Sequence, residues 1–424
     1  MVFKLMIQNI LILGGGFGGV RVALDLAKHL PRNAKITLIN RAPYHSYTPD
    51  YHRIASAFLP EGRKPDPKKF LSLAYTVAIP LKMIFKKYRH VEIVVEEVTD
   101  IFFNENKVEV GSGRGFSYDW LVMALGSKSD YCGMQGIEGR VYAVKKVEEA
   151  LNVRNAVDEL FAHKAKHERI KLAIIGGGFL GCEMAGGLVD FAKKLSALHG
   201  RPRSSFEIII LEAGDRILAG VSSWASATAA ERLKKLGVKI KTASVVTEMS
   251  DKEIIFKNGE HVSYDLAVWT AGVCANSIAA NLPGVKLENK ERLDTDKYLR
   301  LPTGQAGLSS HKNVFVIGDM AHFQGDGMER SLEMTAQAAI HEGRYVAYTL
   351  RRTMFGRRLF PYVPCVNKFL IDLGGRYAIF DSKYVKISGL VAWLMKRAVP
   401  FMYMSDILPW RAAFALWRRG IKIF

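Results

Sequence analysis

The stretch that decides the fold is Ile10–Gly19, ILILGGGFGG, in which a glycine-rich turn directly follows four apolar residues. The same design returns at Leu172–Gly181, LAIIGGGFLG. Both stretches fit Gly-x-Gly-x-x-Gly between a strand and a helix, the pattern of a dinucleotide-binding unit. One such match is weak evidence, because glycine-rich turns occur by chance. Two matches in the same context predict a chain that holds two dinucleotides at once.

Each glycine of such a turn has a separate task. The first allows the tight bend, the second lets the backbone approach a pyrophosphate, and the third permits close helix–strand packing. The pyrophosphate then lies at the helix N-terminus, where backbone donors and the helix dipole favour negative charge. We therefore expect dinucleotide contacts from Gly14, Gly16, Phe17, Gly18 and Gly19 in the first turn and from Gly176, Gly178, Phe179, Leu180 and Gly181 in the second.

Hydrophobic periodicity predicts an α/β chain with two Rossmann-like units and a different C-terminal region. The predicted helices are Val20–Leu30, Leu180–Leu198, Glu231–Leu236 and Ser331–Thr349. The predicted strands are Lys35–Asn40, a hairpin over Val91–Val110, Tyr118–Ala124, Phe206–Leu211, Val238–Val246, Ile254–Phe256, Leu266–Thr270 and Val314–Asp319.

The residue that ends the second strand of each unit indicates which cofactor the unit holds. In the second unit this residue is Glu212, whose carboxylate would accept from a ribose 2′-OH and repel a 2′-phosphate, so it favours NADH over NADPH. The matching residue of the first unit is Asn40, a weaker ribose partner, followed by Arg41, which could meet an adenine or phosphate.

A distant strand assigns the first unit to FAD. Val314–Asp319 ends in Gly318 and Asp319, and a carboxylate at that place would lie near the ribityl chain of a flavin. The FAD domain is then discontinuous, 1–125 and 275–350, with an NADH domain over 126–274 and a C-terminal region over 351–424. The chain's 424 residues suffice for two or three domains.

The tail, from about Lys383 onward, is apolar, aromatic and basic. The formal net charge of the whole chain is +19, which points to an anionic partner. Pro400 and Pro409 predict short helices separated by turns, suited to interfacial docking on an anionic membrane; a cap on the core or a homodimer interface is the alternative. The basic residues of the tail are Lys383, Lys386, Lys396, Arg397, Arg411, Arg418, Arg419 and Lys422.

Other sequence features bear on location and redox chemistry. No run of 18 uncharged apolar residues exists, and the first strand leaves no room for a signal peptide, so we expect the cytoplasmic side of a membrane. The four cysteines form neither a Cys-x-x-Cys pair nor a metal-ligand spacing, and we expect no metal. They are Cys132, Cys182, Cys274 and Cys365.

Taken together, these motifs resemble the type II NADH dehydrogenases, the single-subunit, non-pumping NADH:quinone oxidoreductases, over nearly the whole chain. Ile39–Ala55, with Thr48 and Pro49, is similar to that family's flavin loop, and Ala124-Leu125-Gly126 to its Ala-Thr-Gly segment, with Leu125 in place of Thr. The stretch Gly178–Gly186 resembles its NADH turn, and Trp269–Val273, with Ala271 and Gly272, matches its Trp-Thr-Ala-Gly-Val. The helix containing Ala336, Gln337 and Gly343 resembles its quinone helix.

The resemblance implies FAD and NADH as cofactors, a membrane quinone as acceptor and a peripheral membrane location. Glu183 would lie near the nicotinamide, and Lys368 would lie near the flavin. Gln337 and His341, four apart on one helix face, would hold the two quinone oxygens, although His341 replaces the family's glutamine. We also expect Val98, Ala336 and Gln337 among the FAD contacts.

Two alternatives stay open from the sequence. A sulfide:quinone oxidoreductase-like flavoprotein would need cysteines beside the flavin; Cys132 and Cys365 make a pair conceivable, but Phe179 stands where that family has a cysteine. A basic flavoprotein that binds nucleic acid is permitted by the charge, but the concentration of aromatic and basic residues in the tail favours a membrane. We therefore expect no nucleic acid partner.

Overall fold

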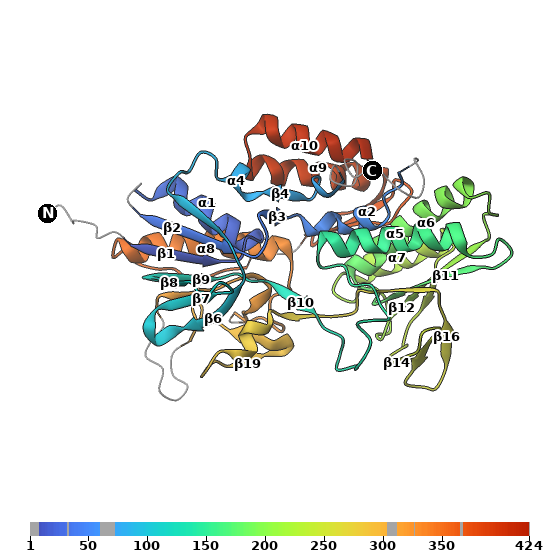
Figure 1. Cartoon of the computed structure of the whole chain (residues 1–424), viewed down its shortest axis with the longest axis horizontal. Coiled ribbons are helices and arrows are strands. Elements are labelled where there is room, and N and C mark those ends of the chain that lie inside the picture. The colour runs from blue at the N-terminus through green and yellow to red at the C-terminus, as the bar shows by residue number, and fades with distance from the viewer. Residues whose placement is uncertain are drawn as a thin grey trace. The chain divides into compact units, whose positions relative to one another are not determined.

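The computed structural model describes residues 8–31, 34–59, 73–302, 312–325, 327–364 and 368–423. Contacts divide the chain into two compact units. Unit 1 comprises Met1–Ser46, Ile79–Lys128 and Val273–Val366, and unit 2 comprises Tyr47–Ala78, Ser129–Gly272 and Asn367–Phe424. Our sequence boundaries placed Tyr47–Ala78 in the first domain, whereas it groups with unit 2. Each unit contains one glycine turn (Figure 1).

Unit 1 is built on a parallel five-stranded sheet in the order β21-β9-β1-β2-β5. The strands are β1 (Asn9–Leu13), β2 (Lys35–Asn40), β5 (Val91–Val95), β9 (Trp120–Met123) and β21 (Val314–Val316). The sheet is covered by α1 (Phe17–His29) and α8 (Ala336–Met354), and by an antiparallel sheet of β6 (Val98–Phe102), β7 (Lys107–Val110) and β8 (Gly115–Ser117).

The alternation of apolar side chains along β1 explains this layering. Leu11 and Leu13 pack into a core with Val108 and Tyr118, on the face covered by the β6–β7–β8 sheet. Ile12 points to the other face, toward Gly19 of α1. Figure 1 shows α1 on one face of the sheet and β6–β8 on the other. The first glycine turn therefore lies at the carboxyl end of a fully buried strand.

Short elements complete unit 1 and its junctions. They are β3 (Tyr44–Ser46), β4 (Ala78–Pro80), α4 (Leu81–Ile84), η2 (Phe103–Glu105), β10 (Ser127–Ser129), β18 (Val273–Ala275), η3 (Ser277–Asn281), β19 (Leu287–Glu288), η4 (Asn289–Glu291), β20 (Arg292–Asp294), η5 (Gly318–Met320) and β22 (Ala321–His322).

Unit 2 repeats the architecture with a parallel four-stranded sheet in the order β13-β12-β11-β17. The strands are β11 (Ile170–Ile175), β12 (Phe206–Leu211), β13 (Lys239–Lys241) and β17 (Leu266–Trp269). Its other elements are η1 (Thr48–Asp50), α2 (Tyr51–Ala55), α5 (Val147–His163), α6 (Phe179–Leu198), α7 (Ser223–Lys235) and the antiparallel strands β14 (Val246–Met249), β15 (Glu253–Phe256) and β16 (His261–Ser263).

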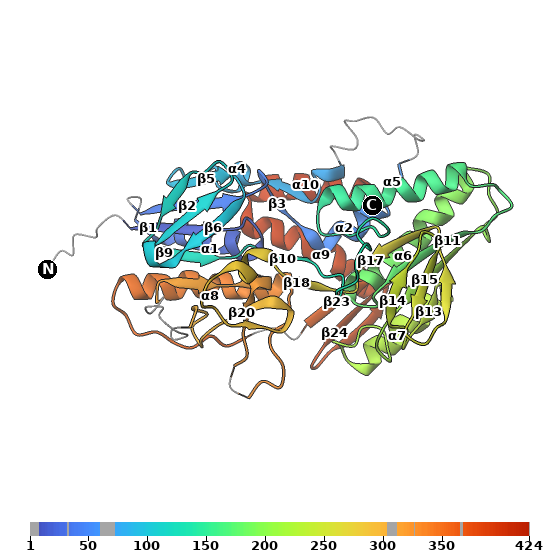
Figure 2. The same cartoon turned by 60° about the horizontal axis from the view of Figure 1, so that its bottom comes forward.

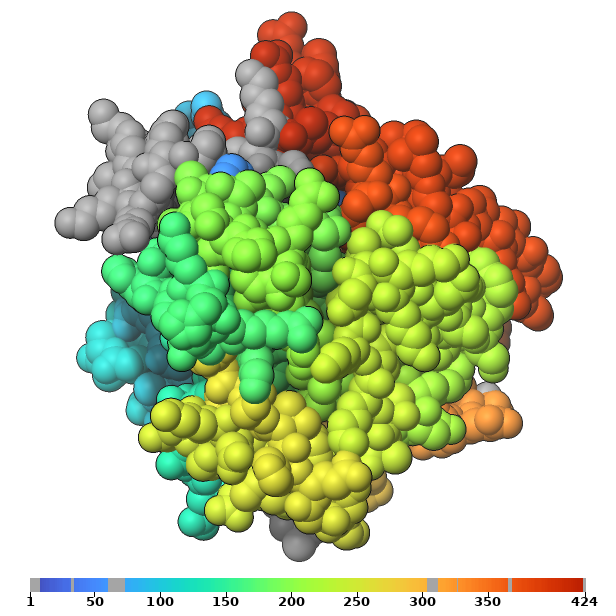
Figure 3. Space-filling view, turned by 90° about the vertical axis from the view of Figure 1, so that its right-hand side faces the viewer, coloured from blue at the N-terminus to red at the C-terminus, as the bar shows by residue number. Residues whose placement is uncertain are grey.

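The C-terminal part of unit 2 forms a three-stranded sheet followed by a helical hairpin. The strands are β23 (Lys368–Asp372), β24 (Ala378–Ser382) and β25 (Lys386–Gly389), and the helices are α9 (Leu390–Ile407) and α10 (Trp410–Ile423). Figures 1 and 2 show the two helices side by side, in agreement with their mutual contacts. Figure 3 shows the orange-red segment that contains these strands next to the yellow-green segment that contains α7. At this contact the Ser222 amide donates to Asp381 at 3.1 Å. Among the described residues, we find no helix with the length and apolarity needed to cross a membrane.

The structure corrects four sequence predictions. Val91–Val95 is a parallel strand of the main sheet, so only Val98–Val110 forms the predicted hairpin. The predicted strand Val238–Val246 is interrupted after Lys241, and α8 begins at Ala336, five residues later than predicted. Pro400 lies inside α9 and does not end it. Proline in a helix interior costs about 3 kcal/mol, and packing of α9 against β23, β24, β25 and α10 offsets this cost.

Candidate functional site

The first glycine turn is fixed by close backbone approaches that exclude a side chain. Gly14 has φ +103°, and a Cβ there would lie 2.2 Å from the carbonyl oxygen of Ala124. A Cβ on Gly19 would lie 1.9 Å from the Gly14 carbonyl oxygen. The turn is therefore locked against β1 and the end of β9, and Ala124 lies in direct contact with Gly14.

The second turn reproduces this geometry in unit 2. Gly176 has φ +108°, and its Cβ would lie 2.5 Å from the Cα of Ala271, while a Cβ on Gly181 would lie 1.9 Å from the Gly176 carbonyl oxygen. The hydroxyl of Thr270 donates to the carbonyls of Ile175 and Gly176 at 2.9 and 2.8 Å. The Trp-Thr-Ala-Gly-Val stretch thus closes the second turn by direct contact.

The central glycines of the two turns are where a dinucleotide fits. Gly16 and Gly178 are the N-caps of α1 and α6, and a Cβ on either would meet no described heavy atom within 4 Å. Neither N-terminus has a side-chain cap within the described chain, and neither first turn contains an acidic residue. Two helix N-termini that lack a side-chain cap among the described residues therefore face open space, as a pyrophosphate requires.

Asn40 and Glu212 occupy matching places and perform the same structural task. The Asn40 Oδ1 accepts from the Gly15 amide at 2.8 Å, and the Glu212 Oε2 accepts from the Gly177 amide at 2.6 Å. Glu212 also accepts from the Gly214 amide through Oε1 at 2.7 Å. The Asn40 Nδ2 instead donates to the carbonyls of Ala42 and Tyr44, at 2.7 and 3.3 Å. Those two carbonyls explain the asparagine, because a carboxylate has no proton to give them.

His45 is a further determinant of the first turn. It is fully buried and lies 2.9 Å, through Nδ1, from the Gly15 carbonyl oxygen, with its ring edge-on to Phe17 at 4.9 Å. Burial lowers the pKa of His45 to about 4, so the ring is neutral and donates to the carbonyl from Nδ1. Sequence reasoning missed this role of His45, because a lone histidine between tyrosines carries no signal of turn support.

Asp319 lies in a second, partly buried polar group of unit 1. Its Oδ2 accepts from the Ser127 hydroxyl at 2.5 Å, and the Leu125 amide donates to the Met320 sulfur at 3.2 Å. On α8, the fully buried Glu342 accepts from the Gly318 amide at 2.5 Å. Burial raises the pKa of Glu342 to about 8, with Asp319 adding to the shift against the Gly318 hydrogen bond and Arg292. Sequence reasoning missed Glu342, although it follows His341 directly.

The predicted quinone helix places its two residues on one face. Gln337 is exposed and His341 is half-buried on α8. The His341 Nδ1 lies 3.1 Å from the hydroxyl of Tyr362, whose ring also contacts Phe323 at 5.0 Å. Burial lowers the pKa of His341, and Arg344 lowers it further. The ring is therefore neutral, with Nδ1 engaged by Tyr362 and Nε2 available for another partner.

Glu183 lies beyond the first turn of its helix. Because α6 begins at Phe179, Glu183 is its fifth residue, and its charge is balanced by side chains instead of the helix N-terminus. The Lys396 Nζ of α9 lies 2.6 Å from Oε1, and the Asp372 amide donates to the same oxygen at 3.2 Å. The His52 Nδ1 lies 3.5 Å from Oε2. Burial lowers the pKa of His52, although Glu183 opposes the shift.

The remaining predicted site residues fall into both units. Val98 packs at the edge of the unit 1 core, Arg41 is exposed, and Gly126 has φ +74°. Thr48 and Pro49 lie in η1, and Lys368 begins β23 with an exposed side chain. These three belong to unit 2, and the flavin contacts predicted for them stay a prediction. Cys365, considered for a redox role, lies outside the described residues.

Comparison with known proteins identifies the class to which this fold and these two turns belong. The profile of the pyridine nucleotide-disulphide oxidoreductases matches residues 8–343, so the chain belongs to that family. Family membership implies the two predicted cofactors, FAD and NADH. Residues 8–343 contain both glycine turns, Asp319 and the predicted quinone helix up to Gly343.

The particular relatives are type II enzymes, which confirms the predicted resemblance. The type II NADH:quinone oxidoreductase Ndh of Mycobacterium tuberculosis is 27% identical, over 97% of this chain and 89% of its own. That of Staphylococcus haemolyticus is 28% identical, over 92% and 94%. Among solved structures, NDH2 of Plasmodium falciparum in complex with NADH has a TM-score of 0.81 at 18% identity, with 98% of each chain covered. The sulfide:quinone oxidoreductase of Aquifex aeolicus shares the fold, with a TM-score of 0.76 at 19% identity, over 94% and 91%.

Proposed function

We propose that this protein oxidises NADH through FAD and passes two electrons to a quinone at a membrane surface, without pumping protons. The observation that carries the proposal is the duplicated turn: two uncapped helix N-termini, each closed by glycines that admit no side chain. When bound, FAD supplies the redox chemistry, as acceptor of a hydride and donor of two electrons. The relatives' names support NADH and quinone as the two substrates.

In this proposal the protein's residues bind FAD, NADH and the quinone, orient their reacting groups and select NADH over NADPH. The first turn and Asp319 hold FAD in a domain formed by 1–125 and 275–350, and Ser127, just beyond the first segment, orients Asp319. The second turn holds NADH in 126–274, and Glu212 hydrogen-bonds the ribose and repels a 2′-phosphate. Glu183 orients the nicotinamide and Lys368 lies near the flavin. Gln337 and His341 hold the quinone oxygens, with the neutral His341 donating from Nε2.

The helical hairpin α9–α10 is the proposed membrane contact. Its exposed apolar side chains include Leu394, Met402 and Trp410, with 55%, 66% and 64% of their surface accessible. Basic residues interleave with them, which suits an anionic interface on the cytoplasmic side. On the opposite side of α9, Ala392, Lys396, Pro400, Met404 and Ile407 are buried. One face of the hairpin thus packs on unit 2, and the other face is exposed and is the one that we propose to contact the membrane.

The sulfide:quinone alternative is the weaker reading. Burial raises the pKa of the Cys182 thiol well above its ordinary value, so this thiol is not a ready nucleophile. Burial and Asp130 also raise the pKa of the exposed Cys132. Neither thiol has the electropositive surroundings that a reactive cysteine needs.

Stopped-flow spectroscopy tests the proposal directly. The purified holoprotein is mixed anaerobically with NADH or NADPH while flavin absorbance is followed, and a short-chain quinone is then added. We expect rapid bleaching by NADH, slower bleaching by NADPH and recovery with quinone. Absence of bleaching by NADH would reject the proposal, and bleaching by sulfide alone would favour the alternative.

The variant Glu212→Gln tests the selectivity within the same experiment. It keeps an acceptor for the Gly177 amide but removes the charge that would repel a 2′-phosphate. We expect the NADH/NADPH preference to fall at least tenfold, mainly through tighter NADPH binding. Glu207→Gln, on the same strand, is the matched control. An unchanged preference in Glu212→Gln would refute the ribose role.

A further inference from the structure

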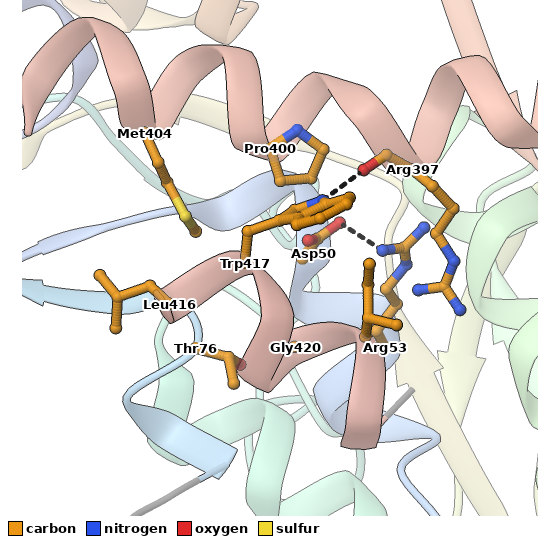
Figure 4. A pocket seen from close by; sticks show the side chains of 10 residues that line it. Asp50, Arg53, Thr76, Arg397, Pro400, Met404, Leu416, Trp417 and Gly420 are labelled. Atoms are coloured by element: carbon orange, nitrogen blue, oxygen red, sulfur yellow. Dashed lines mark hydrogen bonds and ion pairs between the residues drawn. The ribbon is translucent and has the colours of Figure 1, made fainter. Parts of the chain in front are cut away.

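A cavity of about 710 Å³ in unit 2 lies outside both glycine turns. Its wall is formed by α2, α6, the loop between β23 and β24, and the α9–α10 hairpin. A smaller cavity of about 20 Å³ adjoins it, and Arg53, Arg397 and Trp417 line both. Figure 4 shows the side chains around the smaller cavity, with the guanidinium groups of Arg53 and Arg397 side by side.

The charges around this cavity do not balance. Asp372 and Asp50 pair with Arg53, at 3.1 and 3.6 Å, and Glu183 pairs with Lys396 at 2.6 Å. Asp50 lines only the smaller cavity, and the third acid that lines the larger one, Asp190, accepts from the Gly375 amide at 2.7 Å. In the part of the chain that the structure describes, the remaining basic groups, Arg397, Lys194 and Arg376, have no acidic partner. Four basic side chains and three acidic ones line the larger cavity, so its wall has a surplus of one positive charge.

Arg397 shows this surplus most clearly. Burial and, to a smaller extent, the neighbouring Arg53 lower its pKa to about 10, although Asp372 and Asp50 oppose the shift. Its guanidinium is a half-buried cation beside another cation, and it forms no ion pair with a carboxylate among the described residues. On the same wall, His52 is fully buried, and neither ring nitrogen has a hydrogen-bond partner among the described residues. The His52 Nδ1 faces Glu183 at 3.5 Å, so Arg397 is the side chain best placed to meet a polar ligand group.

The rim of the cavity has the opposite character. Leu394 and Ile421 line the cavity, yet 55% and 43% of their surfaces are accessible. Trp393 and Trp417 also line the cavity, and the Arg397 guanidinium lies 5.0 Å from the centre of the Trp393 ring. A cationic floor, aromatic walls and an apolar rim suit an anionic headgroup that carries acyl chains, because guanidinium binds phosphate and tryptophan favours the membrane interface.

We propose that this cavity binds the phosphate of an anionic phospholipid, with Arg397 as its principal contact and the acyl chains passing over Leu394 and Ile421. The inference rests on the proposed membrane association but not on NADH oxidation. A dinucleotide is a poor candidate, because its phosphates are accounted for at Gly16 and Gly178. A quinone headgroup is neutral and would leave the surplus charge unbalanced.

Isothermal titration calorimetry of the holoprotein with dihexanoyl-phosphatidylglycerol, kept below its micelle concentration, tests this site. We expect saturable binding by one lipid, with dihexanoyl-phosphatidylcholine and inorganic phosphate at least tenfold weaker. Arg397→Gln should weaken phosphatidylglycerol binding at least tenfold. The control Arg411→Gln removes the same charge from the exposed face of α10, away from the cavity, and should change affinity less than twofold.

Two further variants keep the test decisive if Arg397→Gln does not fold. Arg397→Lys should retain most of the affinity, and Lys194→Gln should weaken it about threefold. The proposal is overturned if the wild-type protein does not bind saturably, if phosphatidylcholine or phosphate binds as tightly, or if Arg397→Gln binds normally. Displacement of the lipid by a short-chain quinone would also overturn it. Flavin bleaching by NADH on the same preparation shows separately whether the proposed oxidoreductase function holds.

Discussion

Asn40 and Glu212 show how one structural task is met by two residue types. Each accepts from a backbone amide of its glycine turn, so either side chain would keep the turn closed. The difference lies in what surrounds the rest of the side chain. Two carbonyls face the Asn40 Nδ2, whereas a second amide faces Glu212. Asn40 stands where the sequence pattern favours an acidic residue, but its amide hydrogen-bonds the Gly15 amide and the two nearby carbonyls.

Asn40→Asp is expected to weaken the first turn. A carboxylate would place negative charge against the Ala42 and Tyr44 carbonyls and lose two donated hydrogen bonds. We expect a loss of about 1–3 kcal/mol, since a buried unsatisfied acceptor costs this much. It should appear as a lower unfolding midpoint and faster loss of FAD on dilution. Asn104→Asp, the same change at an exposed position, is the control; equal FAD retention in both variants would contradict this explanation.

Glu342 makes a prediction about pH. Its pKa is raised from 4.5 to about 8, so the folded protein retains this proton where the unfolded chain has lost it. The folded state binds the extra proton between about pH 4.5 and 8, and its stability falls as the pH rises through that window. The slope is about 1.4 kcal/mol per pH unit for one such group.

Glu342→Gln should remove this dependence, because the amide resembles the protonated acid and still accepts from the Gly318 amide. Thermal unfolding of the holoprotein between pH 5 and 9 measures the effect. We expect the variant to match the wild type near pH 5 and to be more stable near pH 8. Glu333→Gln, at an exposed position, should leave the wild-type slope intact. The same slope in Glu342→Gln would show that another group is responsible.

At the scale of elements, α9 is tied to α6 by one buried ion pair. Lys396 is only 9% exposed and contacts both Glu183 and the Leu370 carbonyl, at 2.6 and 3.1 Å. A residue counted among the basic groups of the tail is therefore not available to a membrane. Its partner is a residue that sequence reasoning placed beside the nicotinamide. The contact links the proposed membrane hairpin to the helix of the second glycine turn.

Lys396→Met should destabilise the protein by about 3–5 kcal/mol, because removing one partner leaves a buried charge unpaired. The unfolding midpoint in urea measures the loss. The double variant Lys396→Met/Glu183→Gln should recover part of it, since neither charge is then present. Lys386→Met, on the exposed side of β25, should change stability by less than about 0.5 kcal/mol. A double variant no more stable than Lys396→Met would argue against the ion pair as the cause.

At the scale of the whole molecule, the net charge of +19 should govern membrane attachment. The Debye length falls from about 10 Å at 0.1 M salt to about 3 Å at 1 M, so long-range attraction weakens across this range. We expect the affinity for phosphatidylglycerol vesicles, measured by co-sedimentation, to fall at least tenfold between about 0.1 M and 1 M salt. Binding to phosphatidylcholine vesicles should change less than twofold. Salt-independent binding to both would mean that apolar insertion alone holds the protein.

Most of the fold could be predicted from the sequence because its signals are local. The strand before each glycine turn, the helix after it and the strand Lys35–Asn40 all follow from periodicity and glycine spacing within short windows. The prediction was wrong where tertiary contacts override a local signal. Pro400 lies within α9 because this helix packs against both the β23–β25 sheet and α10. Val91–Val95 pairs with β2 in the main sheet instead of forming a hairpin.

The sequence by itself determined two dinucleotide units, the backbone geometry of their turns and the family. These depend on glycines whose conformational freedom is a property of the residue. Only the tertiary structure decided which charged groups meet: Lys396 and Glu183 are 213 positions apart, and Gly318 and Glu342 meet across a buried turn. Burial then determines how such groups titrate. No spacing along the chain encodes that environment, because it is created when separate elements pack together and exclude water.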